Sequence, residues 1–332
     1  MILVTGATGL VGSHLVLHLL EQGQTVKALF RNESGKQKVK KVFEYYNKQE
    51  LFEDINWCQA DILDIPSLEI AFQSRDLGID YVCHCAALIS FDPIDEENLR
   101  KINIEGTQNI ISFCIDFKIK KLCYVSSIAA LGDLAPHEKV VTEECEWNPE
   151  MQHSDYAISK YGAEMEVWRA QQEGLDVVVV NPGVILGPLF WTDGSGEIYT
   201  KVKKGLPFYT KGSTGFVCVN DVVKILFLLM QSTVVSEKFI LISENKTYQE
   251  LVFAIAETLQ VKKPKLYSDK LLTSFAWRID WFLATFFDKK RTLTKDLAST
   301  LHSKDVYSNE KIIKRLGYKY LEIDVYLNSL KN

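Results

Sequence analysis

Apolar residues in this chain fall into short runs that alternate with stretches where they recur every three or four positions. The short runs predict buried strands at Thr25–Phe30, Ile55–Ala60, Tyr81–Cys85, Lys121–Ser126, Val177–Asn181 and Phe239–Ile242. The longer stretches predict helices at Gly12–Gln22, Ser67–Arg75, Leu99–Phe117, Tyr156–Glu173 and Asp221–Gln231. Alternating strands and helices form right-handed crossovers, so we expect an α/β fold with a doubly wound parallel sheet.

The first unit combines an apolar strand, a glycine-rich turn and a helix. Gly6 allows a tight turn, Gly9 allows close approach of a phosphate, and Gly12 lets the helix pack against the strand. Because helix N-termini bind anions, the unit predicts a Rossmann-type dinucleotide site. The residues expected to contact the cofactor here are Gly6, Thr8, Gly9, Leu10, Val11 and Gly12.

The composition changes after Pro182. Residues 183–214 are rich in glycine and proline, and residues 245–332 are helical and aromatic without a second phosphate turn. We therefore expect a dinucleotide-binding domain made of residues 1–182 and 215–244. Residues 183–214 and 245–332 would form a smaller, substrate-binding C-terminal lobe.

Composition narrows the classes of function. The 332 residues have a formal net charge of −5, which does not support nucleic-acid binding. An odd number of cysteines, seven, and the absence of a signal-peptide pattern predict reduced thiols in a cytoplasmic protein. Cys83 and Cys85 have no second Cys/His pair, so no metal site is expected. No apolar run approaches the roughly 20 residues of a membrane span.

The residue that ends the second strand distinguishes the two nicotinamide cofactors. An acidic residue there binds the ribose 2′-hydroxyl of NAD, whereas an arginine accepts the 2′-phosphate of NADP. This chain has Arg31 at that position, with Lys36 and Lys38 shortly after it. The sequence favours NADP(H). NAD(H), with Arg31 as an ordinary surface residue, is the alternative.

Two other strand ends face the same site. Asp61 and Ile62 follow the third strand and are placed to contact the adenine. Ala86 and Ala87 follow the fourth strand, where small side chains let a cofactor lie close.

Tyr156 and Lys160 stand one turn apart on a predicted helix, so their side chains share a face. A nearby ammonium favours the phenolate, so Lys160 is expected to lower the pKa of Tyr156. Ser126 and Ser127 end a predicted strand, where ligands of open α/β sheets bind. A hydroxyl there can donate to a substrate carbonyl oxygen while Tyr156 protonates it. The structural alternatives are that Ser127 caps a turn and that Tyr156 is a core residue. The order along the chain of the glycine turn, the strand-end serines and the Tyr-Lys pair favours catalysis.

Asn103 is a further catalytic candidate on the predicted helix Leu99–Phe117. Its amide could bond to the backbone or to a water that links Lys160 to solvent. A purely structural amide is the alternative.

Together these motifs resemble the extended short-chain dehydrogenase/reductases over essentially the whole chain. The matching stretches are Thr5–Gly12, His84–Ala87, Asn103–Asn109, Val125–Ser127, Tyr156–Lys160 and Asn181–Gly183. The closer likeness is to the dihydroflavonol-4-reductase-like and 3β-hydroxysteroid-dehydrogenase-like branch. It is carried by Ala87–Pro93, Ser127–Gly132, Tyr307–Lys311 and Leu316–Tyr318, with Arg31 and Lys38 matching that branch's NADP pattern.

The resemblance implies that Ser127 orients the carbonyl, that Tyr156 is the acid/base, and that Lys160 lowers the pKa of Tyr156 and binds the ribose. It also implies nicotinamide contacts from the backbone of Pro182 and Val184. Ser126, Tyr156 and Lys160 complete the expected cofactor set. A homodimer through the helices Leu99–Phe117 and Tyr156–Glu173 is expected by the same resemblance.

Two departures count against the sugar-nucleotide epimerases of this family. Ala129 and Leu131 stand where those enzymes place a hydroxyl and a tyrosine, and residues 216–221 contain no arginine for a diphosphate. We therefore expect an NADP(H)-dependent oxidoreductase that acts on the carbonyl or alcohol of a small, fairly apolar substrate. An NAD-dependent nucleoside-diphosphate-sugar epimerase is the alternative. A dinucleotide sensor is a third reading, although a sensor would not need the Tyr-Lys pair.

The C-terminal region contains an aromatic segment, residues 275–287, followed by Lys289, Lys290 and Arg291. Interfacial membrane helices share this pattern. Arg278 and Asp280 interrupt the segment, so we favour a helix in the core of the lobe or an oligomer contact, and expect no binding to liposomes. The lobe's aromatic residues fit an apolar substrate, with core packing as the alternative: Trp191, Trp277, Phe282, Phe286 and Phe287.

Overall fold

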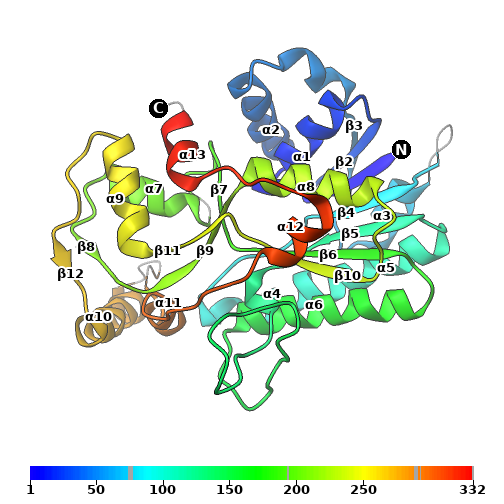
Figure 1. Ribbon diagram of the computed structural model, residues 1–332. Helices are drawn as coiled ribbons and strands as arrows, with labels where there is room; N and C mark the ends of the chain where they lie inside the picture. The colour runs from blue at the N-terminus through cyan, green and yellow to red at the C-terminus, as the bar shows by residue number, and fades with distance from the viewer. Residues whose placement is uncertain (74–77, 193, 288–290, 292, 331–332) are drawn as a thin grey trace.

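A computed structural model describes residues 1–73, 78–192, 194–287, 291 and 293–330 (Figure 1). Its centre is a seven-stranded sheet in the order β10-β6-β5-β4-β1-β2-β3. All neighbouring strands of this sheet pair in parallel, which confirms the predicted doubly wound α/β fold. The strands are β1 (Ile2–Thr5), β2 (Val26–Phe30), β3 (Asn56–Gln59), β4 (Tyr81–His84), β5 (Lys121–Val125), β6 (Val177–Pro182) and β10 (Glu237–Leu241).

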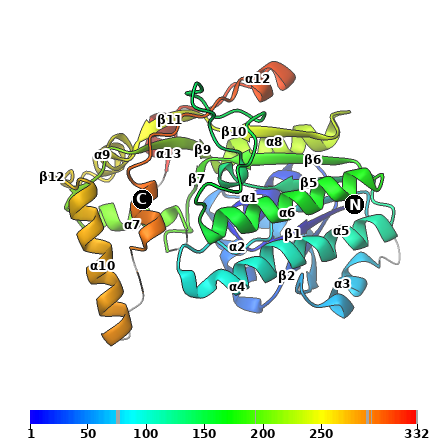
Figure 2. The same cartoon turned by 90° about the horizontal axis from the view of Figure 1, so that it is seen from below.

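Helices cover both faces of the sheet (Figures 1 and 2). The central strands are buried on both sides, as the continuous run of buried residues in β6 shows. One face carries α1 (Leu10–Glu21), α2 (Glu33–Tyr45), α8 (Val219–Gln231) and α12 (Glu310–Leu316). The other carries α3 (Ile65–Phe72), α4 (Glu96–Leu99), α5 (Gly106–Asp116) and α6 (Asp155–Gln172).

The remaining elements form a lobe at one end of the sheet (Figure 1). A small sheet orders its strands β11 (Glu244–Thr247), β9 (Ser213–Cys218) and β7 (Val184–Leu186). Its apolar core includes side chains of α7 (Gly196–Lys203), α9 (Tyr248–Thr258) and α13 (Ile323–Ser329). The short strands β8 (Phe208–Tyr209) and β12 (Leu266–Tyr267) pair beside α10 (Lys270–Phe287) and α11 (Lys295–Thr300).

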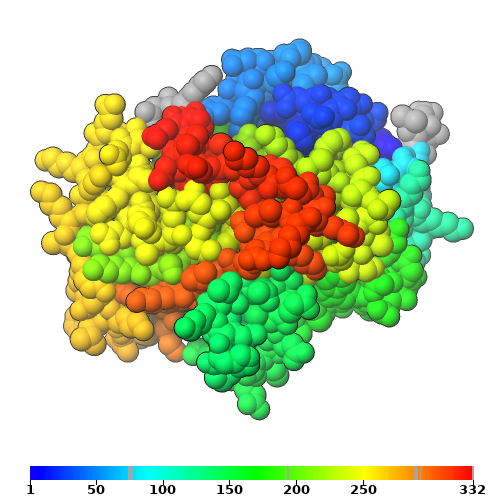
Figure 3. Space-filling view, in the orientation of Figure 1, coloured from blue at the N-terminus to red at the C-terminus, as the bar shows by residue number. Residues whose placement is uncertain are grey.

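The C-terminal segment ties the lobe to the large sheet. It crosses the front of the molecule in Figure 3. Its backbone forms isolated bridges from Lys304 to Ser213 and from Tyr307 to Val141. Further along, the Asn309 Nδ2 donates to the Ile242 carbonyl at 2.9 Å.

Several element boundaries differ from the sequence expectation. Helix α1 begins at Leu10 rather than Gly12, and α3 spans Ile65–Phe72; the predicted helix end, Arg75, lies outside the described residues. The predicted helix Leu99–Phe117 is interrupted by a π-helical turn at Arg100–Glu105. Such turns often occur at functional sites, and this one carries Asn103.

The aromatic segment forms α10, and the expectation that it is a core helix is wrong. Thr273 is the one residue of α10 that is buried. Phe282, Phe286 and Phe287 are exposed, so these rings do not pack in a lobe core. Lys289 and Lys290 lie outside the described residues. Among the described helices, none combines the length and apolar content needed to cross a bilayer.

Candidate active site

The glycine turn after β1 packs too closely for side chains. Gly6 has a φ of +63°, in the left-handed region that favours glycine. A Cβ atom on Gly6 would overlap the backbone of Ala86, and one on Gly12 would overlap the Gly6 carbonyl. Helix α1 begins with exposed Gly9 as its N-cap and has no side-chain cap. This uncapped N-terminus fits an anionic group such as a pyrophosphate.

The loop after β2 lies beside the glycine turn. A Cβ atom on Gly35, in the first turn of α2, would press on the Thr8 side chain. Arg31 is exposed directly after β2, and its carbonyl accepts a 3.0 Å hydrogen bond from Gln59 Nε2. Arg31 therefore stands just before a helix whose first turn lies against Thr8.

The lysines of α2 differ in their surroundings. Lys36 Nζ pairs with Glu33 at 2.9 Å and lies 3.9 Å above the Phe30 ring. Lys38 is exposed on the same helix. Lys36 is therefore engaged within its own helix and with β2.

The loop after β3 is anchored to α5. The Ile62 carbonyl accepts from Asn109 Nδ2 at 2.9 Å, and the Ile62 side chain lies against Gly106. Asp61 Oδ1 accepts from the Leu63 N–H at 2.9 Å. These contacts fix the loop expected to face the adenine.

The loop after β4 touches the glycine turn. The Ala86 N–H donates to Thr5 Oγ1 at 3.2 Å, and Ala87 is exposed. The two loops thus meet at one edge of the sheet, which is the topological switch point of this strand order.

Tyr156 and Ser127 meet where β5 ends and α6 begins. The Ser127 hydroxyl is close enough to the Tyr156 phenol to lower its pKa, and Ser127 Oγ accepts from the Ala129 N–H at 3.1 Å. Burial raises the pKa of Tyr156, and the Ser127 hydroxyl offsets this only in part. The expectation that Lys160 lowers this pKa is wrong in the protein alone: the pKa of Tyr156 lies above its ordinary value, and Ser127, not Lys160, is the group that lowers it.

Lys160 is buried behind this pair. Its Nζ donates to Tyr124 Oη at 2.8 Å and to the Val125 carbonyl at 2.9 Å. Burial lowers the pKa of Lys160 to about 7, with the charge of Glu164 acting in the opposite direction. The lysine therefore joins α6 to the end of β5. Sequence reasoning did not identify Tyr124 as its partner.

A buried carboxylate, Glu164, fixes the backbone that carries the serines. Its Oε2 accepts from Ser126 Oγ at 2.7 Å and from Asn181 Nδ2 at 2.9 Å. The same Asn181 amide donates to the Ser127 carbonyl at 3.0 Å. Sequence reasoning missed Glu164. Its place four residues after Lys160, on the same helix face, was an available signal.

Asn103 bonds to backbone, one of the two partners expected for it. Its Oδ1 accepts from the Leu88 N–H at 2.7 Å, and its Nδ2 donates to the Leu88 carbonyl at 3.0 Å. The amide also donates to Ser159 Oγ at 2.9 Å. Asn103 thereby ties the loop after β4 to the π-helical turn and to α6.

His84 forms a polar core under the site. Its Nδ1 lies 2.6 Å from Thr5 Oγ1 and its Nε2 lies 3.0 Å from Thr107 Oγ1. The ring stacks on Tyr124, with centroids 5.6 Å apart. Burial and then the charge of Lys160 lower the pKa of His84 to about 3, so the imidazole is neutral.

Pro182 and Val184 lie on two strands that leave the site. Pro182 ends β6 and is buried, whereas Val184 begins β7 and is half-buried. Gly183 joins them and packs against the Gly215 carbonyl, which leaves no space for a Cβ atom.

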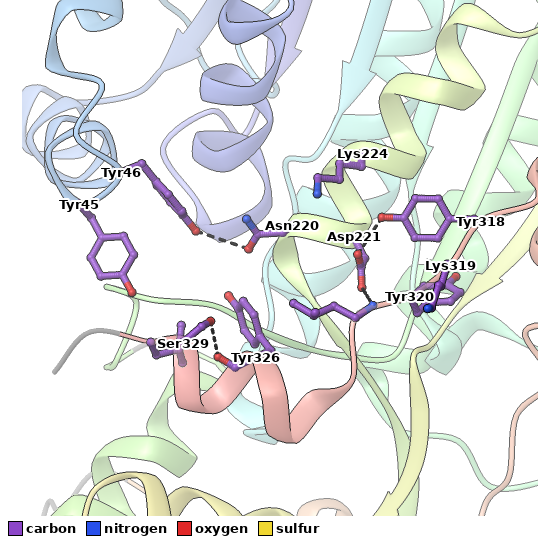
Figure 4. Close-up of a pocket in the computed structure, with 12 residues that line it drawn as sticks. Tyr45, Tyr46, Asn220, Asp221, Lys224, Tyr318, Lys319, Tyr320, Tyr326 and Ser329 are labelled. Carbon is purple, nitrogen blue, oxygen red and sulfur yellow. Dashed lines mark hydrogen bonds between the residues drawn. The ribbon is translucent and has the colours of Figure 1, made fainter.

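A cavity of about 430 Å³ lies on the opposite face of the sheet (Figure 4). It is lined by α2, by α8 and by the C-terminal segment. Tyr46 donates to Asn220 there, and Tyr318 donates to Asp221 at 2.7 Å. The candidate catalytic residues do not line this cavity, so it is distinct from the site at the end of β5.

Comparison with known proteins places the geometry in a family. Residues 2–242 match the NAD dependent epimerase/dehydratase family. The chain belongs to this family. Family members here include reductases and epimerases, and the chain is an NAD(P)-dependent enzyme of the extended short-chain dehydrogenase/reductase type.

Two relatives of this chain have names that describe reductases. A Synechocystis protein named "Putative dihydroflavonol 4-reductase" is 30% identical over 95% of this chain and 88% of its own length. Tetraketide alpha-pyrone reductase 2 of Arabidopsis thaliana is 31% identical over 75% of this chain and 80% of its own length. The UDP-glucose 4-epimerase of Thermotoga maritima has the same fold, with a TM-score of 0.76 and 22% identity over 98% of this chain and 96% of its own.

Proposed function

We propose that this enzyme transfers a hydride between NADP(H) and the carbonyl or alcohol of a small, fairly apolar substrate. The observation that carries the proposal is the placement of Ser127, after β5, beside Tyr156 at the start of α6, with Lys160 one turn further along the helix. The hydroxyls of this pair can both bond to one substrate oxygen. They stand at the strand end where ligands of such sheets bind.

The cofactor fits the edge of the sheet described above. The uncapped N-terminus of α1 would hold the pyrophosphate, and the backbone of Pro182 and Val184 would face the nicotinamide. Lys160 and Tyr156 would contact the ribose, with Ser126 nearby. The bound nicotinamide supplies the hydride.

The protein supplies the proton and the orientation. Because burial raises the pKa of Tyr156, its Oη is protonated at neutral pH and can donate to a substrate carbonyl oxygen. Ser127 Oγ donates to the same oxygen and stabilises the charge that develops on it. Once the substrate oxygen carries the proton, the Ser127 hydroxyl turns to the phenolate left on Tyr156, whose pKa it lowers.

The preference for NADP(H) rests on Arg31. This residue is exposed directly after β2, shortly before the first turn of α2 that lies against Thr8, and no carboxylate ends that strand. A guanidinium binds phosphate oxygens in a planar, bidentate manner.

The first experiment compares NADPH and NADH on a panel of apolar aldehydes and ketones. We expect turnover with a preference for NADPH. Arg31→Asp should shift the ratio of kcat/KM values toward NADH by about tenfold or more, because one charge-assisted phosphate contact contributes about 1.5–3 kcal/mol. Lys36→Asp is the matched control, since Lys36 is engaged with Glu33 and Phe30. An unchanged ratio in Arg31→Asp would remove this residue from cofactor recognition.

A nucleoside-diphosphate-sugar epimerase is the second candidate, since the fold of a UDP-glucose 4-epimerase covers the chain. Such an enzyme would retain NAD through purification and bind UDP- or GDP-sugars. The named reductases among the relatives, and Ala129 and Leu131 in place of a hydroxyl and a tyrosine, support the reductase. Bound NAD together with sugar-nucleotide affinity would reverse this choice.

A further inference from the structure

Helix α10 turns its large apolar side chains toward solvent. Six of them follow the spacing of one helix face and are between 47% and 82% exposed: Leu271, Leu272, Phe275, Ile279, Phe282 and Phe286. On a helix of 3.6 residues per turn they fall within about 100° of arc. A surface helix ordinarily directs such a stripe to the core. In α10 the direction is reversed.

The opposite face of α10 is held to the lobe by polar contacts. The buried Thr273 hydroxyl lies 3.0 Å from Ser268 Oγ and 2.8 Å from His302 Nε2. The Asp280 carboxylate accepts from the Leu293 N–H at 3.2 Å and lies 3.8 Å from Arg291 Nε. These contacts fix the orientation of the helix, so the apolar stripe is a built feature of the surface.

Helix α10 stands at the end of the lobe and extends away from the body of the molecule (Figure 2). It packs against α11, which begins at Lys295. Burial, and then repulsion from Glu96 and Asp296, raises the pKa of Asp155. The charge of Asp296, at the start of α11, therefore acts on Asp155, which precedes Tyr156 at the start of α6.

We propose that α10 docks this enzyme on the surface of a phospholipid membrane, with the apolar stripe inserted at the boundary of headgroups and acyl chains. An interfacial helix needs an apolar face and a polar face, and it needs no shape-matched partner. Within Lys270–Phe287 the one charged side chain on the stripe's half of the helix is Arg278. Insertion therefore buries no carboxylate and brings a cation to the lipid phosphates.

A second copy of this chain is the competing occupant of the stripe. An 18-residue helix is about 27 Å long and about 10 Å wide. Two such faces laid together would bury on the order of 600 Å², roughly half of the smallest area typical of a specific, stable interface. A lipid surface has no such threshold, because insertion of each apolar side chain contributes independently.

The test is co-sedimentation of the full-length protein with vesicles of phosphatidylcholine and phosphatidylglycerol. We expect the wild type to sediment with the vesicles, and Phe275→Glu/Phe282→Glu to bind at least about tenfold more weakly, because two large apolar groups are lost from the stripe. Ile70→Glu is the matched control, since Ile70 is 66% exposed on α3, away from the lobe. It should bind as the wild type does. Neither substrate nor cofactor is needed, so this result is independent of the proposed reaction.

Two results would overturn the proposal. One is recovery of the wild type in the supernatant at the level of a lipid-free sample. The other is self-association, followed by sedimentation velocity, that the double variant abolishes and Ile70→Glu retains, which would assign the stripe to a second copy. Quenching of wild-type tryptophan fluorescence by brominated lipid provides a measurement that needs no variant. Quenching is expected, and its absence would contradict the membrane assignment.

Discussion

Two residues of α6 that lie near the end of β5, Tyr156 and Lys160, have pKa values shifted in opposite directions. Burial raises the pKa of Tyr156, which keeps the phenol protonated, and lowers the pKa of Lys160 to about 7. A protonated phenol is the form that a proton donor to a carbonyl needs. The hydrogen bonds of Lys160 to Tyr124 and Val125 hold α6, the helix that carries Tyr156, against the end of β5.

Glu164 is a positioning residue, because it touches Ser126 and Asn181 rather than the reacting atoms. We expect Glu164→Leu to lower kcat about tenfold or more and to reduce the free energy of unfolding by about 3 kcal/mol, since buried donors lose their acceptor. The NADPH dissociation constant should change little. Kinetics and denaturant unfolding of the purified variant would measure both effects.

Glu164→Gln is the conservative control for this prediction. An amide oxygen can still accept from Ser126 and Asn181, so kcat should stay within about threefold of the wild type. Equal loss of kcat in both variants would show that the charge of Glu164, rather than its hydrogen bonds, is what the site requires.

At the scale of elements, local patterns predicted the unit from β1 to α1 well. Its glycines are required by contacts within a few residues and with the neighbouring loop after β4, so the local sequence carries the information. The π-helical turn at Arg100–Glu105 was not predictable, because Asn103 is fixed by Leu88 and Ser159 from distant segments. The orientation of α10 was missed for a related reason. A periodic pattern of apolar residues shows that a helix has an apolar face, but it does not show whether that face points to the core or to solvent.

The polar core between β1, β4 and α5 should make stability depend on pH. His84 has a pKa of about 3 in the folded protein and takes up a proton near pH 6.5 when unfolded. Its contribution is therefore present at pH 7 and is lost as the pH falls below about 6.5. At pH 5 the loss from this residue is about 2 kcal/mol.

We expect His84→Gln to lose about 2 kcal/mol less stability than the wild type between pH 7 and pH 5. Denaturant unfolding at both pH values would measure this difference. His14, whose pKa burial lowers to about 4, contributes equally in both proteins and cancels. Parallel loss of stability in the two proteins would contradict the account of a neutral, buried His84.

At the scale of the whole molecule, the strand order determines where chemistry can occur. The order reverses beside β1, and the loops after β1, β2, β4 and β5 reach the same edge. The sequence predicted this arrangement because each loop follows a recognisable strand. It did not predict Glu164 or Tyr124, whose roles depend on the packing of α6 against β5 and β6. The division into two domains and a homodimer through α5 and α6 remain our proposals.

The central claim is that Tyr156, paired with Ser127, gives its proton to a substrate carbonyl. Its most direct test is to measure both kcat and the NADPH dissociation constant of the Tyr156→Phe variant. This substitution removes one oxygen and keeps the ring. We predict a fall in kcat of about 10² to 10⁴ with the NADPH dissociation constant within about threefold of the wild type. Turnover at the wild-type rate in this variant would contradict the account.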